Sequence, residues 1–464
     1  MTLDPDAILH RWNRVLEQRG ACAAIYDTRG NVLRTFAGIE DEARELAETE
    51  LANIRAGQVV AIQVGNHPAW PALLLGCLRR GLVALPLERS ISANEREIAL
   101  ATCGAAAVVS TSNDGVVAIE TRAAAVINWD EHQPVLLKLT SGTTAAPRAI
   151  RFQSAQLLAD CDQICDTMGI GENDVNFAVI PASHSYGFSN LITPLIARGV
   201  PMVLSSDRMP RAVLDDLNRT NATVFPGMPV FYQAFCELDA VPDLPHLRLC
   251  ISAGAPLLLS VAQRFRDKFG KPIHSFYGSS ECGGICYDRE AALVEPGFVG
   301  QPMNGVQLEL LDEDPGATRV CVQSAAAADG YFPLSDVAKL GLGAFAPDDL
   351  LAERAGGFAI VGRTSDIINV AGKKVNPAEV EATLLAFSGV RDAAVFGLRS
   401  SLRNEEVAAC IVASTTVTEA VLLEFCRSRL SGWQVPKRLF FLAAMPVNER
   451  GKISRRALAE RFAL

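Results

Sequence analysis

Short runs of apolar, largely β-branched residues recur along most of the chain and are separated by helix-like stretches. These runs are VVAIQV at 59–64, AAVVST at 106–111, VNFAVI at 175–180, PMVLSS at 201–206, ATVFPG at 222–227 and LRLCISAG at 247–254. Segments with a helical pattern, such as WPALLLGCLRRG and SAQLLADCDQICDTMG, lie between many of them. Strands that alternate with helices in this way predict layers of parallel α/β structure.

The chain has 464 residues, which is too long for one ordinary core. A break is expected near Gly362, after which Asn376, Pro377 and Glu379 give a helix-start signal. Two strand candidates, AAVFGL and VAACIVAS, and a further helix follow. We therefore predict a large N-terminal α/β domain over 1–362 and a small α+β domain over 363–464.

Composition narrows the class of protein. The hydrophobic fraction is 49% and the charged fraction 20%, which is typical of a globular protein. No apolar run reaches the roughly 18 residues of a membrane span, and the first residues lack a secretory pattern, so a cytoplasmic location is expected. A net charge of −9 argues against general nucleic-acid binding. The exception is a basic tail between Arg427 and Arg461, with nine Lys/Arg against two Asp/Glu.

The twelve cysteines are scattered and form no CxxC pair. Buried thiols in a reducing compartment are therefore favoured over disulfides or a zinc site. Ser154 is expected to cap the helix that follows it, which would place Cys161 and Cys165 on one buried face.

The first motif is LKLTSGTTAAPRAI, at 137–150. It places four hydroxyls, on Thr140, Ser141, Thr143 and Thr144, around Gly142. A glycine lets backbone approach an anion closely, so such a turn can cradle phosphate oxygens. A Ser/Thr-rich surface loop would look the same. The motif is not a Walker loop, because no GxxxxGK[ST] string occurs.

Three further segments carry chemistry. YGSSECGG, at 277–284, combines the ring of Tyr277, on which a purine could stack, with the carboxylate of Glu281, which could hold Mg²⁺ against phosphates. GRTSDIINVAGKKVNPAEVE, at 362–381, lies at the predicted domain break. NERGKISRR, near the end of the chain, places Lys452 in a Gly-Lys turn.

These four segments, in this order and at these distances, resemble the adenylate-forming superfamily of acyl-CoA synthetases, luciferases and nonribosomal-peptide adenylation domains. The resemblance covers nearly the whole chain. It implies an acyl-CoA synthetase-like α/β fold with a mobile C-terminal domain. The implied activity is AMP-forming: Mg²⁺ and ATP convert a carboxylic acid to an acyl-adenylate, and the acyl group passes to CoA.

The resemblance also implies a nucleotide site. Thr140 to Thr144 would close over the β- and γ-phosphates, Asp349 would hold the ribose, and Arg363 would approach ribose and phosphates. Contacts with ATP or AMP are assigned to Thr140, Ser141, Gly142, Thr143, Thr144, Arg148, Gly254, Ala255, Tyr277, Gly278, Ser280, Asp349 and Arg363, with Glu281 as the metal ligand. Three positions depart from the usual pattern: Ala145 replaces Gly, Arg148 replaces Lys and Ser280 replaces Thr.

For the acid, the resemblance implies a pocket gated by His184. Its lining would include His184, Ser185, Phe188, Phe225 and Met228. His184, Phe188 and Phe225 would equally suit an ordinary core. The apolar candidates favour an aryl or aliphatic acid over an amino acid.

Catalysis in such a family depends on charge and positioning, because a carboxylate is already a nucleophile at neutral pH. Lys452 would bridge the carboxylate and the α-phosphate, with Glu281 and His184 beside the reacting groups. Ser365 aligns with the hinge, where many relatives have Asp or Lys. The Gly372 loop would face CoA, and the basic tail would suit a phosphate-rich ligand.

Alternatives remain. An acyl carrier protein could replace CoA as the acceptor, and a non-catalytic nucleotide- or acyl-binding relative is a second reading. RNA binding through the basic tail is a remote third.

Overall fold

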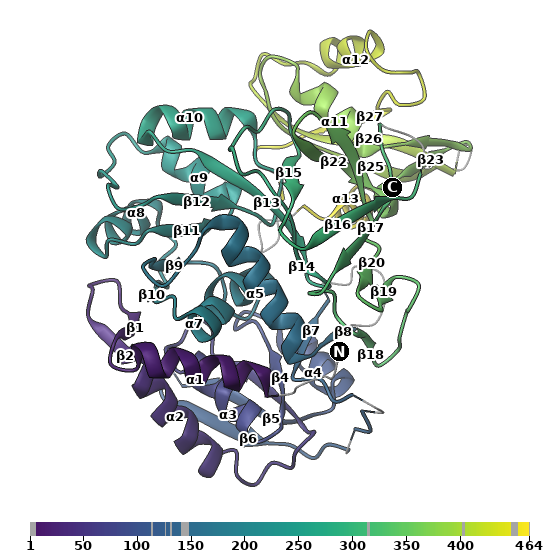
Figure 1. Ribbon diagram of the computed structural model, residues 1–464. Coiled ribbons are helices and arrows are strands. Elements are labelled where there is room, and N and C mark those ends of the chain that lie inside the picture. The colour runs from purple at the N-terminus through teal and green to yellow at the C-terminus, as the bar shows by residue number, and fades with distance from the viewer. Residues whose placement is uncertain are drawn as a thin grey trace. The chain divides into compact units, whose positions relative to one another are not determined.

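The computed structural model describes residues 6–112, 115–125, 127–129, 132–140, 148–312, 316–400, 404–446 and 453–463. The chain forms two compact units (Figure 1). The first comprises Met1–Glu309, Cys321–Ala346 and Ala355–Phe358, and the second comprises Leu310–Val320, Pro347–Arg354 and Ala359–Leu464. No helix in the described ranges has both the length and the apolar character that a bilayer span requires.

One sheet of the first unit has the strand order β18-β8-β7-β4-β3-β5-β6. Its strands are β3 (Val59–Gln63), β4 (Val83–Pro86), β5 (Ala105–Thr111), β6 (Val117–Thr121), β7 (Leu136–Leu139), β8 (Ala149–Phe152) and β18 (Gly330–Phe332). The central strands pair in parallel, whereas β7 and β8 form an antiparallel hairpin that β18 extends. The expected phosphate loop therefore begins at the end of β7 and returns into β8.

The second sheet of this unit runs β2-β1-β10-β9-β11-β12-β13-β14-β15. Its strands are β1 (Ala23–Tyr26), β2 (Val32–Thr35), β9 (Asn176–Ala178), β10 (Met202–Leu204), β11 (Val224–Gly227), β12 (Leu249–Ser252), β13 (Ile273–Ser279), β14 (Gly283–Tyr287) and β15 (Phe298–Pro302). From β1 to β13 the pairing is parallel, apart from the β1–β2 hairpin. The predicted parallel layers are confirmed, with strands that are mostly shorter than their apolar runs.

Helices cover these sheets. They are α1 (Ala7–Arg19), α2 (Phe36–Glu48), α3 (Trp70–Arg79), α4 (Ala93–Thr102), α5 (Ser154–Met168), α6 (Ser185–Gly187), α7 (Thr193–Arg198), α8 (Pro210–Arg219), α9 (Pro229–Glu237) and α10 (Leu259–Phe269). In Figure 1 the purple helices α1 and α2 pack together, and both contact α3. The short β19 (Leu340–Gly341) and β20 (Ala344–Phe345) pair beyond β18.

The start of α5 differs from the sequence prediction. Gln153 is the N-cap and Ser154 is already helical and fully buried, so Ser154 does not cap. The backbone N–H of Gln153 donates to the side chain of Gln156 at 2.8 Å, as in a capping box. The other prediction for α5 is confirmed, because Cys161 and Cys165 are both buried. All twelve cysteines are free, and most are buried.

A π-helix, η1 (Phe188–Ile192), lies between α6 and α7. The preceding Gly187 packs so closely that an added Cβ would lie 2.0 Å from the carbonyl oxygen of Pro181. Single π-turns occur frequently at functional sites. Here the turn follows directly on the segment expected to hold the acid.

The second unit has a sheet of order β24-β23-β26-β25, with β27 beside β26. Its elements are η2 (Thr364–Asp366), β23 (Ile368–Val370), β24 (Lys373–Val375), α11 (Pro377–Leu385), β25 (Val390–Ser400), β26 (Asn404–Ala413), α12 (Glu419–Arg427), β27 (Arg438–Phe441) and α13 (Arg455–Phe462). Strand β21 (Asp349–Arg354) and most of β22 (Gly357–Arg363) also belong to this unit, whereas most of β16 (Val306–Leu310) and of β17 (Val320–Ser324) belongs to the first.

Helix α11 begins as predicted, with Asn376 as the cap and Pro377 at the first position. The side chain of Asn376 accepts a bond from the N–H of Ala378 at 3.1 Å. Glu379, the third residue of the helix-start signal, would complete a capping box by accepting a bond from the backbone N–H of Asn376, but its carboxylate accepts a bond from Gln434 at 2.7 Å instead.

Two glycines with matched backbone allow a test of packing in the first unit. Gly283 and Gly270 have φ of 69° and 65°, so alanine at either position is strained by about 1–2 kcal/mol. A Cβ on Gly283 would lie 1.9 Å from Oδ1 of Asp160, whereas Gly270 has open space around it. Gly283→Ala should therefore lower the free energy of unfolding by about 1–3 kcal/mol more than Gly270→Ala, because Asp160 must leave its hydrogen bonds. Denaturant unfolding of both variants checks this, and equal losses would contradict it.

Candidate active site

The two ends of the predicted phosphate loop are tied together at its base. The backbone N–H and the hydroxyl of Thr140 both donate to the carbonyl of Arg148, at 2.8 and 3.1 Å. Ser141, Gly142, Thr143, Thr144 and Ala145 lie outside the described residues. The structure therefore fixes where the loop starts and returns.

Arg148 packs its guanidinium over an aromatic ring. Its Cζ lies 4.3 Å from the ring centroid of Tyr331, and its Nη1 lies 4.0 Å from a carboxylate oxygen of Asp336. Tyr331 is buried in β18, where it pairs with Ile150 of β8. Arg148 stands two residues from Ile150, so ring and guanidinium are diagonal neighbours on one face.

Glu281 is held by the same tyrosine. The Tyr331 hydroxyl donates to Oε1 of Glu281 at 3.2 Å, and the hydroxyl of Ser279 accepts the N–H of Glu281 at 3.2 Å. Burial is the main influence on the carboxyl and raises the pKa of Glu281. A carboxylate surrounded by hydroxyls offers the hard oxygen ligands that Mg²⁺ takes, with phosphates completing its shell, so these residues fit the metal.

A buried ammonium that the sequence analysis missed lies close by. Lys138 of β7 is 5% exposed, and its Nζ lies 4.7 Å from the ring centroid of Phe152 and 5.0 Å from that of Phe188. Burial lowers the pKa of Lys138 to about 8. The attraction of Asp160 and Glu281 acts in the opposite direction, because it favours the charged ammonium. The signal available in the sequence was a lysine inside the apolar run VLLKL.

Asp160 was also missed. This carboxylate of α5 is 3% exposed and accepts bonds from the hydroxyl of Ser189 at 2.5 Å and the N–H of Gly284 at 3.0 Å. It therefore joins the π-helix of the expected acyl segment to the end of the YGSSECGG motif. Nothing in the sequence distinguishes it from a solvated helix acid.

The acyl and nucleotide segments meet at two hydroxyls. Ser185 donates to Ser280 at 2.8 Å, and nearby the rings of Tyr186 and Phe276 lie 5.9 Å apart. His184 precedes this contact as the N-cap of α6 and is half-buried. The structure thus brings together three predicted site residues from two distant motifs.

The expected pocket lining divides into two groups. Phe188 packs on Trp70 with ring centroids 5.7 Å apart, and Phe225 lies in an aromatic cluster with Phe231 and Phe235; each of the two is 1% exposed. Both therefore belong to the core. Met228 is half-buried and lies beside Gly254, where an added Cβ would be 3.9 Å from its Cγ.

The residues assigned to ATP or AMP at the ends of β12 and β13 differ in exposure. Gly254 and Ala255 are exposed at the end of β12, while Tyr277 in β13 is only 7% exposed. Gly278 follows it, and a Cβ there would lie 2.6 Å from the carbonyl oxygen of Gly283, so the β13–β14 hairpin requires glycine. The buried hydroxyl of Ser252 has no hydrogen-bond partner within the described ranges.

In the second unit, Asp349 and Arg363 form an ion pair, with the Arg363 Nε 2.7 Å from a carboxylate oxygen. Asp349 is 8% exposed, and Arg363 is exposed. Ser365, the predicted hinge, is exposed in η2. Gly372 has φ of 88° in the exposed β23–β24 turn, and its N–H donates to Asn369 at 2.9 Å.

Lys452 lies outside the described residues. The chain that follows it is anchored within the second unit. Ile453 packs against a core cluster, and the guanidinium of Arg455 bonds both carboxylate oxygens of Glu381 at 2.9 Å and one of Asp366 at 2.6 Å.

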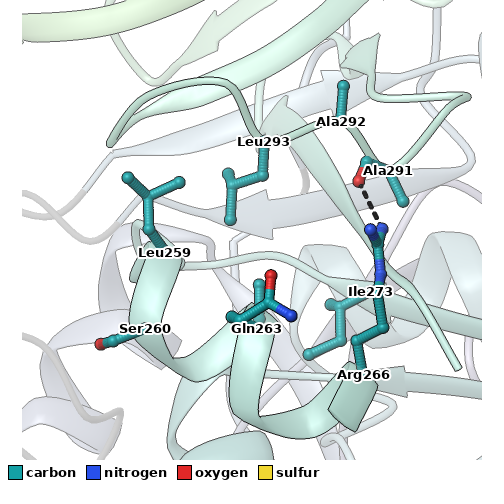
Figure 2. Close-up of a pocket in the computed structure, with 9 residues that line it drawn as sticks. Leu259, Ser260, Gln263, Arg266, Ile273, Ala291, Ala292 and Leu293 are labelled. Atoms are coloured by element: carbon teal, nitrogen blue, oxygen red, sulfur yellow. Dashed lines mark hydrogen bonds between the residues drawn. The ribbon is translucent and has the colours of Figure 1, made fainter. Parts of the chain in front are cut away.

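Away from these motifs, the first unit has a surface pocket of about 350 Å³ on α10. Figure 2 shows Leu259, Gln263 and Arg266 facing the turn at Ala291 and Leu293, where Arg266 donates to the carbonyl of Ala291 at 3.0 Å. None of its lining residues was predicted as a site residue. Within the described ranges, no group of three or more His, Cys, Asp or Glu is arranged to hold a metal.

Because of Lys138, the free energy of unfolding is expected to change with pH in the alkaline range. The pKa of its ammonium is 10.5 in an unfolded chain and about 8 here, so between these values the unfolded state binds more protons. The wild type should therefore gain stability relative to Lys138→Met as pH rises from 8 to 10, by up to about 1.4 kcal/mol per pH unit. Unfolding of both proteins at pH 7.5 and pH 10 checks this. A difference that stays constant with pH would contradict it.

The chain matches known proteins along nearly its whole length. Residues 12–332 match the AMP-binding enzyme family, and residues 379–452 match the AMP-binding enzyme C-terminal domain. A probable CoA ligase of Humulus lupulus is 26% identical over 92% of this chain and 91% of that protein. The oxalate–CoA ligase of Arabidopsis thaliana is 26% identical over 89% and 90%.

Among solved structures, the o-succinylbenzoate CoA synthetase of Bacillus subtilis, in complex with its acyl-adenylate intermediate, has a TM-score of 0.83. It is 23% identical and covers 99% of this chain and 98% of its own. That likeness confirms the predicted fold class. Because the family model spans more than half of the sequence, the chain belongs to the family of AMP-binding enzymes.

Proposed function

We propose that this enzyme is an AMP-forming carboxylate–CoA ligase. It takes a carboxylic acid, ATP and CoA and yields an acyl-CoA, AMP and pyrophosphate. Family membership supports the class of reaction, and relatives that match about nine-tenths of the chain bear the names of CoA ligases. The free, mostly buried cysteines support a reducing compartment such as the cytoplasm.

The observation that carries the proposal is the contact of Ser185 with Ser280 at 2.8 Å. It places the segment assigned to the acid directly against the segment assigned to the nucleotide, within one compact unit. Attack of a carboxylate on a phosphorus atom requires the two reactants to be held in line and close together. A juxtaposition of this kind supplies that positioning.

In the first step, a carboxylate oxygen attacks the α-phosphorus of ATP, a C(O)–O–P linkage forms and pyrophosphate leaves. No general base is needed, because the nucleophile is already ionised at neutral pH. The barrier is repulsion between anions, so cations carry the catalysis. We assign Lys452 to the carboxylate and α-phosphate, and Arg148 with Thr140–Thr144 to the outer phosphates. Mg²⁺ held by Glu281 would neutralise phosphate charge.

In the second step, the thiol of CoA attacks the acyl carbon, the bond from that carbon to the phosphate oxygen breaks, and AMP leaves with the oxygen. We assign the Gly372 turn and the basic tail to CoA, and Ser365 to the hinge. Asp349 and Arg363 are assigned to the ribose. Their ion pair orients the carboxylate before a nucleotide arrives.

For the acid, we propose that His184 and Met228 line the pocket, with Phe188 and Phe225 behind them as its supporting core. Gly254 and Ala255 are exposed and Ser252 has a buried hydroxyl without a partner in the described ranges, which supports a ligand-binding position at the end of β12. The apolar side chains favour an aryl or aliphatic acid. Relatives act on acids as different as oxalate and o-succinylbenzoate, so the acid must be found by experiment.

Pyrophosphate release from Mg·ATP across aryl, short-chain, dicarboxylic and long-chain acids tests the proposal, with and without CoA. One class of acid should trigger release, and CoA should accelerate it. Lys452→Ala should lose on the order of a hundredfold or more in rate. Lys271→Ala, at a partly exposed lysine after α10, is the matched control and should keep full rate.

Two results would overturn this assignment. Release that CoA does not accelerate, but an acyl carrier protein does, would show that the acceptor is the carrier. Absence of pyrophosphate release with every acid would exclude a ligase and would favour a non-catalytic nucleotide- or acyl-binding protein.

A further inference from the structure

Tyr331 makes two contacts with residues of the nucleotide site. Its ring supports the guanidinium of Arg148, 4.3 Å from the centroid, and its hydroxyl donates to Glu281 at 3.2 Å. Arg148 ends the predicted phosphate loop, and Glu281 is the proposed metal ligand. No sequence motif singled out this tyrosine.

The backbone fixes Tyr331 in this place. β18 pairs with β8 so that Tyr331 lies opposite Ile150 and Gly330 opposite Arg151. On the other side, the N–H of Ala328 donates to the carbonyl of Glu281 at 3.0 Å. The segment 328–331 is therefore bonded both to the strand that leaves the phosphate loop and to the turn that carries Glu281. The ring itself is 3% exposed, so its side chain has little freedom to move.

The two contacts use different parts of the side chain. A planar guanidinium stacks on an aromatic face, which a lysine ammonium cannot reproduce in the same way. The hydroxyl gives a charged acceptor its hydrogen bond and leaves the second carboxylate oxygen for other ligands. Asp336 does not replace the ring as a partner of Arg148, because its carboxylate is 4.0 Å away and both side chains are half-exposed.

We propose that Tyr331 is a positioning residue that couples Arg148, at the base of the phosphate loop, to Glu281, on the metal side of the nucleotide. The ring orients Arg148 toward the phosphates, and the hydroxyl orients Glu281 toward the metal bound to those phosphates. Arg148 and Glu281 therefore respond to the nucleotide as one unit. This inference rests on the proposed function for its nucleotide and its metal.

Equilibrium binding of ATP by calorimetry, with Mg²⁺ and with EDTA, separates the two contacts. Tyr331→Phe keeps the ring and loses the hydroxyl, so ATP affinity should fall about tenfold with Mg²⁺ and stay unchanged in EDTA. Tyr331→Leu loses both contacts, so affinity should fall under both conditions. Tyr26→Phe, a half-buried tyrosine in β1, is the matched control and should change neither affinity.

A double-mutant cycle tests the coupling itself. Arg148→Lys should weaken ATP binding several-fold in the wild type and have little further effect in Tyr331→Leu, because the ring it needs is already gone. Unfolding midpoints without nucleotide show whether each variant is folded.

The proposal is overturned if Tyr331→Phe weakens binding equally with and without Mg²⁺, or not at all, or if Arg148→Lys has the same effect in both backgrounds. A wild type that binds ATP no better with Mg²⁺ would overturn the metal assignment of the proposed function as well, so the two failures are distinguishable.

Discussion

The buried carboxylate of Asp160 is the constraint on which the site depends. It accepts bonds from Ser189 in the π-helix and from Gly284 at the end of the nucleotide motif, and it lies so close to Gly283 that only glycine fits there. A buried charge is tolerated only when its acceptors are satisfied. Asp160 therefore holds helix α5, the π-helix η1 and the YGSSECGG segment in one arrangement. The last two of these carry predicted site residues.

Lys138 is linked to the same carboxylate. An ammonium in the core between aromatic rings is costly alone, and the two carboxylates that attract it, Asp160 and Glu281, favour its charged form. Glu281 is in turn oriented by Tyr331. Surroundings of low dielectric constant strengthen all of these interactions. Fixed charges stabilise a transition state best in such surroundings. The candidate site is thus a set of charged groups, Lys138, Asp160 and Glu281, that the fold itself holds in place.

The sequence predicted the α/β layers well because these depend on local periodicity, whereas the family followed from the resemblance of its motifs. The parallel strands, the buried face with Cys161 and Cys165, and the Asn376 cap all follow from spacing and residue type. Burial was harder to predict. For Phe188 and Phe225 the sequence left pocket lining and ordinary core equally open, and only the structure shows that they pack on Trp70 and on an aromatic cluster that includes Phe235.

Contacts between residues far apart in the chain could not be predicted from the sequence. Asp160 looks like any acid on an amphipathic helix until Gly284, 124 positions away, is seen to donate to it. Tyr331 and Arg148 meet only because β18 pairs with β8. Gln153, and not Ser154, is the N-cap of α5, because Ser154 is buried in the core. Tertiary packing decided each of these cases, and one sequence carries no record of it.

The most direct test of the central claim follows an oxygen atom. An acid labelled with ¹⁸O in its carboxylate is turned over with ATP and CoA, and the products are weighed by mass spectrometry. Activation as an acyl-adenylate predicts one labelled oxygen in AMP and none in pyrophosphate, because the carbon–oxygen bond breaks when the thiol attacks. Label in pyrophosphate or in inorganic phosphate, or thioester formation without any label in AMP, would contradict the account.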